Sequence, residues 1–289
     1  MMSPRQIQDG TDPLTVPAQF EPGHVWQWPL TGLERRVDRI LTRLIARVAR
    51  AQIPEISHWE RLLPDHDPFI LIANHSSRRE ALYLGTLCLL LRSGKPVRFL
   101  ADWNFRLIPG VGYLYDRSGV ITIARKPARP RFLNRFKRRF MQSTSPFDQA
   151  RATLAAGGAV GFFPEGTVNR DASRLLPGRI GAARLSIETQ APVLPVGLRF
   201  AGRRRDGLID SNSPFRIEVG VPMSPPHSDG TAPPQLVQNW HQEIMAALAP
   251  LCGKASTNEI DAQTSPEQRA QNVNPVSGPP NGARGGSVC

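Results

Sequence analysis

The chain has 289 residues, of which 40% are hydrophobic and 21% are charged. These proportions are typical of a folded protein with a sizeable core, and they exclude a wholly disordered or fibrous chain. Lysine and arginine outnumber aspartate and glutamate by 36 to 24, which gives a formal net charge of +12. This excess predicts an anionic partner: nucleic acid, a phospholipid surface, a phosphorylated substrate or an acidic carrier protein.

Cysteine usage and hydropathy narrow the class of protein further. Cys88, Cys252 and Cys289 are widely spaced, which argues against a disulfide framework or a cysteine zinc site and favours a reducing compartment. No apolar run reaches the ~18 residues of a membrane-spanning helix, and the N-terminal residues lack the hydrophobic stretch of a secretory signal. We therefore expect a cytoplasmic protein that is peripheral on the inner face of the membrane.

The two ends of the chain differ in composition from its middle. Residues 1–28 are rich in proline and polar groups, and residues 253–289 contain scarcely any apolar side chain. Both segments are expected to be disordered, since neither can bury enough apolar surface to fold. The folded domain is therefore expected to span residues 29–252.

The positive charge is concentrated in two segments, and the rest of the chain is balanced. The first, residues 31–50, contains six arginines and two acidic residues. Apolar residues recur in it at helical spacing, with arginines on the remaining faces: Leu33, Val37, Ile40, Leu41, Leu44, Ile45 and Val48. Such a basic amphipathic helix either docks into anionic lipid headgroups or packs as a surface helix on its own domain.

The second basic segment, residues 125–140, contains eight cationic residues and no acidic one. Phe132, Phe136 and Phe140 occur in it at four-residue steps. One phenylalanine per helical turn among cations is typical of an interfacial helix, while a nucleic-acid patch and a merely solvated face remain open.

Between the two ends, short β-like runs alternate with helical stretches. Strands are expected at 69–73, 97–100, 119–123, 159–163, 193–198 and 215–219, and helices at 79–91, 147–156, 180–189 and 234–248. Apolar strands alternating with helices predict a single α/β domain with a mixed, largely parallel sheet covered by helices. In such sheets, functional sites collect in the loops that follow the strands.

The first expected strand is followed by a candidate base and a candidate partner. His75 can accept a proton near pH 7, and Glu80 is the nearest carboxylate downstream. The two side chains can meet only if His75 lies in the loop and Glu80 lies in the first turn of the next helix. Ser77 and Glu80 also form an S-x-x-E capping box, so Glu80 orients His75, caps the helix or does both.

A second cluster of polar groups follows the strand expected at 159–163. The turn Pro164-Glu165-Gly166-Thr167 brings backbone N–H groups, a hydroxyl and a carboxylate together. Arginines nearby in the sequence are candidates to bind a phosphate group; they are Arg125, Arg170, Arg174 and Arg179.

Together these segments resemble the glycerolipid acyltransferase family typified by bacterial 1-acylglycerol-3-phosphate acyltransferases. Four motifs occur in the family's order across residues 66–222. They are N-H-x4-D, similar to Asn74-His75 with Glu80; G-x-I-x-I-x-R, similar to Gly119 through Arg125; F-P-E-G-T, present at Phe163 through Thr167; and a V-P-type strand, similar to Ala191 through Val196.

The resemblance implies direct acyl transfer from acyl-CoA or acyl-carrier protein to a lysophospholipid hydroxyl, most simply that of lysophosphatidate. His75 is implied as the general base and Glu80 as the residue that orients it. Arg125, Glu165, Gly166 and Thr167 are implied to form the acceptor site. No metal and no cofactor other than the acyl donor is implied, and the expected partners are an anionic membrane surface and the two substrates.

Two positions depart from the family pattern. Glu80 stands where the family has Asp, and Val168-Asn169 stands where Arg-Ser follows E-G-T. Arg170 is a candidate to replace that arginine. The departures leave two alternatives: an acyltransferase for another acceptor such as a lyso-ornithine lipid, or a non-catalytic protein that binds lipid surfaces. Nucleic-acid binding is least favoured, because no recognised binding motif accompanies the charge.

Overall fold

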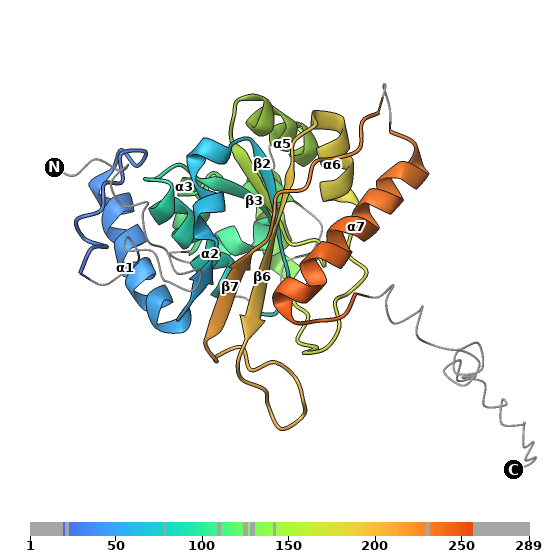
Figure 1. Cartoon of the computed structure of the whole chain (residues 1–289). Helices are drawn as coiled ribbons and strands as arrows, with labels where there is room; N and C mark the ends of the chain where they lie inside the picture. The colour runs from blue at the N-terminus through green and yellow to red at the C-terminus, as the bar shows by residue number, and fades with distance from the viewer. Residues whose placement is uncertain are drawn as a thin grey trace, which may run out of the picture.

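A seven-stranded sheet passes through the middle of the molecule (Figure 1). The computed structural model describes residues 20, 23–77, 79–108, 111–123, 127, 131–140, 143–228 and 232–256. The strands are β1 (Ile56–Ser57), β2 (Phe69–Ala73), β3 (Val97–Asp102), β4 (Ile121–Ile123), β5 (Ala159–Phe162), β6 (Val193–Phe200) and β7 (Phe215–Val219). Their order across the sheet is β1-β7-β6-β2-β5-β3-β4, and within it only the β6–β7 pair is antiparallel.

Helices cover both faces of this sheet. The α-helices are α1 (Arg36–Gln52), α2 (Arg79–Leu91), α3 (Val111–Arg117), α4 (Lys137–Phe140), α5 (Pro146–Ala155), α6 (Gly181–Thr189) and α7 (Pro234–Cys252). Leu71 of β2 belongs to a core shared with α1 and α2, whereas its neighbours Ile70 and Ile72 belong to a core shared with α5, α6 and α7. Alternate side chains of one strand thus enter two cores, and the expected α/β class with a mixed sheet is confirmed.

The pairing of β2 determines where the site lies. Ile70 pairs with Val160 of β5 on one side and with Val193 of β6 on the other. All three strands run parallel, and the arrowhead of β6 points toward the lower edge in Figure 1. The loops that follow β2 and β5 therefore leave the sheet side by side at that edge.

Parts of both ends that were expected to be disordered are packed in the folded domain. Phe20 and Val25 are 1% exposed and lie in the core beside α1 and α2, so described residues before 29 are packed. At the other end, Lys254 and Ser256 are buried, because the chain after α7 packs against the loop that follows β5. Residues 1–19 and 257–289 lie outside the described residues.

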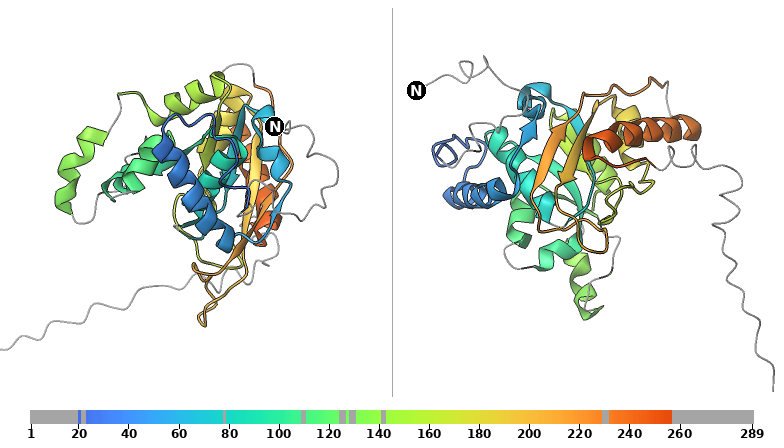
Figure 2. Two further views of the ribbon diagram at one scale, coloured as in Figure 1. Left: turned by 90° about the vertical axis from the view of Figure 1, so that its left-hand side faces the viewer. Right: turned by 60° about the horizontal axis from the view of Figure 1, so that its bottom comes forward.

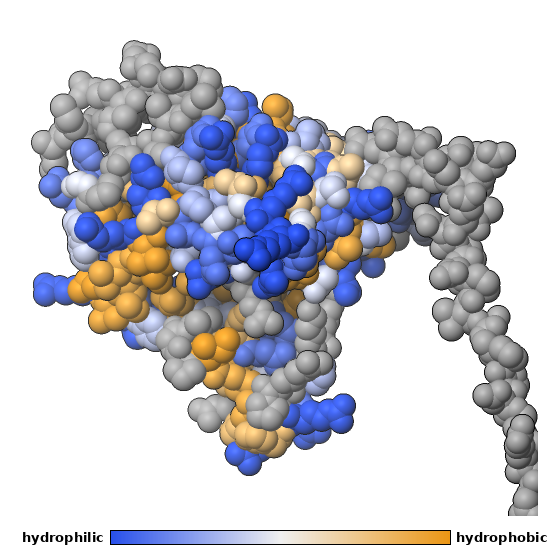
Figure 3. Space-filling model, turned by 90° about the horizontal axis from the view of Figure 1, so that it is seen from below, coloured by the Kyte–Doolittle hydropathy of each residue, from blue (hydrophilic) through white to orange (hydrophobic). Residues whose placement is uncertain are grey.

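Helix α1 presents its large apolar side chains to solvent. Val37, Ile40, Leu44 and Val48 are 45–58% exposed, and they share one face because their spacing follows the helical repeat. The side chains that α1 buries are Asp38, Thr42, Ala46 and Ala49. Figure 3 shows the resulting apolar area on the left, where α1 lies in Figure 1.

The buried side of α1 is attached to α3 by a charged contact. Asp38 is 4% exposed, accepts a 2.6 Å hydrogen bond from the Tyr113 hydroxyl and forms an ion pair with Arg117 at 2.6 Å. This contact turns the polar side of α1 inward. The expected basic amphipathic helix is therefore present, with its apolar stripe facing outward.

Among the described residues, none of the helices has the length and apolar content to cross a bilayer.

The second basic segment differs from the regular helix that was expected. Residues Arg131–Phe136 form a 3-10 helix and Lys137–Phe140 a short α-helix, in a part of the chain that projects from the domain (Figure 2). Phe132 is 63% exposed, but Phe140 stacks on Trp103 with ring centroids 6.3 Å apart. The change of helix type breaks the four-residue repeat, so the three phenylalanines do not form one apolar stripe.

Candidate active site

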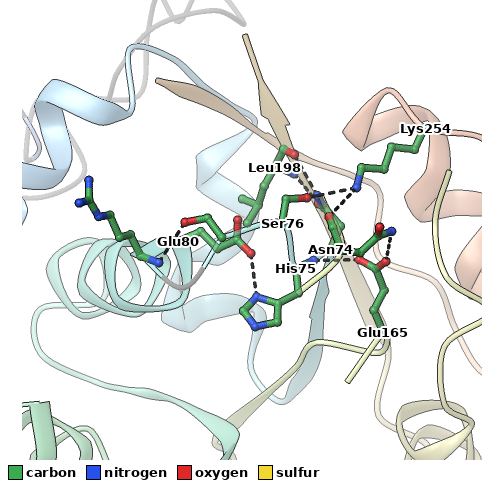
Figure 4. Close-up of polar contacts among 10 residues, drawn as sticks. Asn74, His75, Ser76, Glu80, Glu165, Leu198 and Lys254 are labelled. Carbon is green, nitrogen blue, oxygen red and sulfur yellow. Dashed lines mark hydrogen bonds and ion pairs between the residues drawn. The ribbon is translucent and has the colours of Figure 1, made fainter. Parts of the chain in front are cut away.

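The site is built around a hydrogen bond between His75 and Glu80. Strand β2 ends at Ala73, so His75 lies in the loop, and Glu80 is the second residue of α2. Nδ1 of His75 lies 2.8 Å from Oε1 of Glu80 (Figure 4). The Glu80 side chain is fully buried, while that of His75 is 16% exposed. With Nδ1 donating to the carboxylate, Nε2 carries the lone pair that can accept a proton.

Glu80 serves His75 more directly than it serves the helix end. The Ser77 hydroxyl accepts a 3.1 Å hydrogen bond from the Arg79 N–H, which caps the first turn. Burial raises the pKa of the Glu80 carboxyl, and the hydrogen bond from His75 and the nearby N–H groups of Ser76 and Ser77 oppose that rise. The carboxylate therefore lies against both His75 and the helix end, and the two interpretations of Glu80 are compatible.

The backbone of His75 is held on both sides by the loop that follows β5. Its N–H donates to Oε1 of Glu165 at 2.9 Å, and its carbonyl accepts from the Asn169 N–H at 2.6 Å. The other Glu165 oxygen accepts from the Asn169 side chain at 2.6 Å and from the Leu176 N–H at 3.1 Å. Glu165 is 5% exposed, and its carboxylate joins the loops that follow β2 and β5.

Asn74 fixes the other side of the loop after β2. The Asn74 side chain donates to the Leu198 carbonyl at 3.0 Å and accepts from the Leu198 N–H at 2.7 Å. The backbone pairing of β2 with β6 reaches only Ala73 and Val196. The amide of Asn74 therefore extends the ladder by one rung and sets where His75 leaves the sheet.

Two aromatic rings support the imidazole. The Phe163 ring centroid lies 4.6 Å from that of His75, and Phe99 stacks on Phe163 at 5.5 Å. Gly161 makes room for this arrangement, because a Cβ there would lie 2.5 Å from the Phe99 ring. The stack limits the tilt of the imidazole, since such ring pairs have preferred geometries.

The turn after Glu165 supplies the exposed part of the site. Gly166 and Thr167 are exposed, and Gly166 has a φ of +66° that favours glycine. A Cβ on Gly166 would lie 2.7 Å from Nε of Arg179, so the Arg179 side chain lies across this turn. Arg170 is also exposed, and Arg125 lies outside the described residues.

Neither buried thiol fits the role of a nucleophile. Burial raises the pKa of Cys88 to about 12 and that of Cys252 to about 11. Both groups are therefore protonated near neutral pH and shielded from substrate. Within the described ranges, no three His, Cys, Asp or Glu side chains are grouped as a metal site requires.

Comparison with known proteins agrees with these motifs. The Acyltransferase family model matches residues 56–199, about half of the chain. This chain belongs to the acyltransferase family. The matched range contains His75, Glu80, Glu165 and Arg179, and the expected family resemblance is confirmed.

Two curated relatives carry a more specific name. A chloroplastic 1-acyl-sn-glycerol-3-phosphate acyltransferase of Brassica napus is 28% identical over 149 residues, which are 52% of this chain and 38% of the relative. A protein of the same name from Chlamydomonas reinhardtii is 27% identical over 207 residues, 71% of this chain and 56% of the relative. The chain thus spans 38% of one relative's length and 56% of the other's.

One solved structure of a similar protein also aligns with this chain. It is the 1-acyl-sn-glycerophosphate acyltransferase PlsC from Thermotoga maritima, which is 18% identical. The alignment covers 84% of this chain and 90% of that chain with a TM-score of 0.49, a likeness too distant to add to the fold described above.

Sequence reasoning brought His75 and Glu80 together correctly, and it missed three residues that hold them. Asn169 stands where the family pattern has the serine of Arg-Ser, so the sequence marks it only as a departure. Phe99 lies within β3, where a phenylalanine is expected as an ordinary core residue. Lys254 fell in a segment expected to be disordered, and no local pattern marks it.

Replacing Glu80 by glutamine tests its role. The E80Q variant should lose about 10²–10⁴-fold in acyl-transfer rate, because a neutral amide cannot stabilise an imidazolium. It should fold normally, because the burial that raises the pKa of the Glu80 carboxyl penalises a charged group, and a neutral amide does not carry that penalty. Turnover and thermal unfolding measured on the same preparation check both expectations.

Ser77→Ala is the matched control for E80Q, since the Ser77 hydroxyl caps the same helix turn through the Arg79 N–H, whereas His75 is bonded by Glu80. S77A should lower the unfolding temperature while keeping most turnover. Wild-type turnover in E80Q would reduce Glu80 to a cap of α2.

Proposed function

We propose that the protein transfers a fatty acyl chain from acyl-CoA or acyl-carrier protein to the hydroxyl of a lysophospholipid. The observation that carries this proposal is the 2.8 Å contact between His75 and Glu80 inside an acyltransferase-family domain. The curated relatives are named 1-acyl-sn-glycerol-3-phosphate acyltransferases, which favours lysophosphatidate as the acceptor and phosphatidate as the product.

The chemistry follows from the protonation of His75. Its Nε2 accepts the proton of the acceptor hydroxyl while the hydroxyl oxygen attacks the thioester carbonyl carbon. The carbon–sulfur bond then breaks, and the leaving thiolate takes the proton from the imidazolium. Glu80 stabilises the imidazolium between these steps. Ester and free thiol are the products, and the transfer passes through no acyl-enzyme.

The arginine that faces the acceptor phosphate in this proposal is Arg179. Its side chain lies across Gly166 in the exposed turn beside the site, where it supplies a cation that Val168-Asn169 lacks. Guanidinium groups bind phosphate by charge-assisted, often paired hydrogen bonds. A cation at this turn favours a phosphate-bearing acceptor over a lyso-ornithine lipid, with Arg170 as the nearest competitor for the same role.

An anionic membrane surface is the proposed partner of α1. The exposed stripe of Val37, Ile40, Leu44 and Val48 is flanked by exposed arginines, among them Arg36 and Arg47. Apolar side chains enter the boundary between headgroups and acyl chains, and the arginines contact anionic lipid. Docking on the inner face of a membrane would bring the site to a lipid acceptor.

The deciding experiment measures thiol release from acyl-CoA and from acyl-carrier protein, with lysophosphatidate presented in anionic vesicles. We expect acceptor-dependent release with at least one donor, and its near-complete loss in His75→Ala, because general-base catalysis contributes about 10²–10⁴-fold. Release with neither donor would contradict the proposed reaction. Substantial release by His75→Ala would contradict the mechanism.

Arg179→Gln tests the acceptor site. The Michaelis constant for lysophosphatidate should rise about tenfold or more with little change in kcat, since a charge-assisted hydrogen bond contributes ~1.5–3 kcal/mol. Arg174→Gln, an exposed arginine on the same loop, is the matched control and should leave the constant unchanged. If the Michaelis constant for lysophosphatidate were the same in wild type and Arg179→Gln but higher in Arg170→Gln, phosphate binding would be assigned to Arg170.

Ile40→Asp combined with Leu44→Asp tests membrane docking. Binding to anionic vesicles should fall about tenfold or more, because each apolar side chain contributes ~1.5–3 kcal/mol when fully buried. The fold should be unaffected, since both side chains are exposed. Val221→Asp replaces an exposed apolar residue that follows β7 instead of one on α1, and it is the control in the same sedimentation assay. Undiminished binding of the double variant would show that α1 is not the docking surface.

A further inference from the structure

Lys254 joins the site from outside the region that carries its motifs. Helix α7 ends at Cys252 and is capped by Gly253, whose φ of +67° is the left-handed conformation common at helix ends. The chain then turns, and the Lys254 N–H donates back to the Ala249 carbonyl at 3.0 Å. This turn directs the side chain inward, and Lys254 is only 6% exposed.

The Lys254 ammonium contacts both loops that form the site. Its Nζ donates to the Ser76 hydroxyl at 3.1 Å and to the Asn169 carbonyl at 3.3 Å (Figure 4). Ser76 directly follows His75, and Asn169 donates its own N–H to the His75 carbonyl. The ammonium therefore holds the residues that flank His75 in sequence and in space.

The charge of Lys254 has a counterpart in the same buried region. Glu165 is 5% exposed and its carboxylate holds His75 and Leu176. Lys254 and Glu165 both act electrostatically on the Cys252 thiol, with opposite effects on its pKa. A buried ammonium is costly unless hydrogen bonds compensate it, and the Ser76 hydroxyl and the Asn169 carbonyl supply such bonds here.

The backbone beside Lys254 strengthens this attachment. Ala255 donates to the Ser173 carbonyl at 2.7 Å and accepts from the Leu175 N–H at 3.0 Å. Ser173 and Leu175 belong to the loop that begins at Glu165. Residues 254 and 255 thus hold that loop through backbone as well as side-chain hydrogen bonds.

We propose that Lys254 is a positioning residue for the acyl transfer, which acts by holding Ser76 and Asn169 so that His75 keeps its place beside Glu80. This inference rests on the proposed function, because it concerns the same His75. Lys254 does not react with substrate in this arrangement, since its buried ammonium donates to the Ser76 hydroxyl and the Asn169 carbonyl.

The test compares Lys254→Met with Lys95→Met. Lys254→Met keeps the length of the side chain and removes its hydrogen-bond donors. It should lower kcat about tenfold or more while the acceptor Michaelis constant stays within about twofold, because small misplacement of a catalytic group costs rate. Lys95 pairs with Asp67 and donates to the Gly157 carbonyl, neither of which contacts His75 or Glu80. Lys95→Met should therefore leave kcat and the Michaelis constant unchanged.

Ser76→Ala provides a second variant if Lys254→Met fails to fold. It removes the hydroxyl that Lys254 contacts and should also lower kcat without raising the Michaelis constant. The double variant should lose little more than the worse single one, because coupled residues are not additive. The proposal would be overturned if the fold-losses in kcat of the two single variants multiplied in the double variant. It would also be overturned if the fraction of unfolded protein accounted for the whole fall in kcat.

Hydrogen exchange of the backbone amides at residues 74–77 gives a readout independent of turnover. Exchange should be faster in Lys254→Met than in Lys95→Met, because the loop opens more easily. Unchanged exchange and unchanged kcat in an enzyme active as wild type would overturn the role of Lys254 and leave the proposed function intact. Faster exchange in a protein without acyl transfer would sustain the positioning contact and overturn the proposed function.

Discussion

The buried carboxylate of Glu165 is the interaction on which the site depends. It accepts hydrogen bonds from the His75 N–H, the Leu176 N–H and the Asn169 side chain. An ionised group with so little exposure is tolerated only when its oxygens are satisfied. Satisfying them requires that the loops after β2 and β5 lie together, so His75 is placed by a constraint that involves none of its ring atoms.

The remaining contacts act on the same loop from other directions. Asn74 binds both backbone groups of Leu198, and Phe163 supports the imidazole from one face. Glu80 then fixes Nδ1 from the first turn of α2. The longer side chain of glutamate still reaches the imidazole in this arrangement, and its full burial removes the carboxylate from water.

The outward-facing stripe of α1 is a consequence of packing as well as of pattern. Helical spacing alone separates an apolar face from a basic one, and either could have faced the domain. Asp38 decides the orientation, because its contacts with Tyr113 and Arg117 turn the opposite side of the helix inward. Val37, Ile40, Leu44 and Val48 are left exposed, on the area visible in Figure 3.

The sequence by itself determined the α/β class, most strands and helices, and the pairing of His75 with Glu80, because these depend on local periodicity and on motifs a few residues long. Tertiary structure decided what lies far apart in the chain. It buried Glu165 beneath His75, laid Arg179 across Gly166, and brought Lys254 to Ser76 across 178 positions. No local pattern encodes such contacts, since they arise only when parallel strands place their carboxyl ends at one edge and a helix end closes over it.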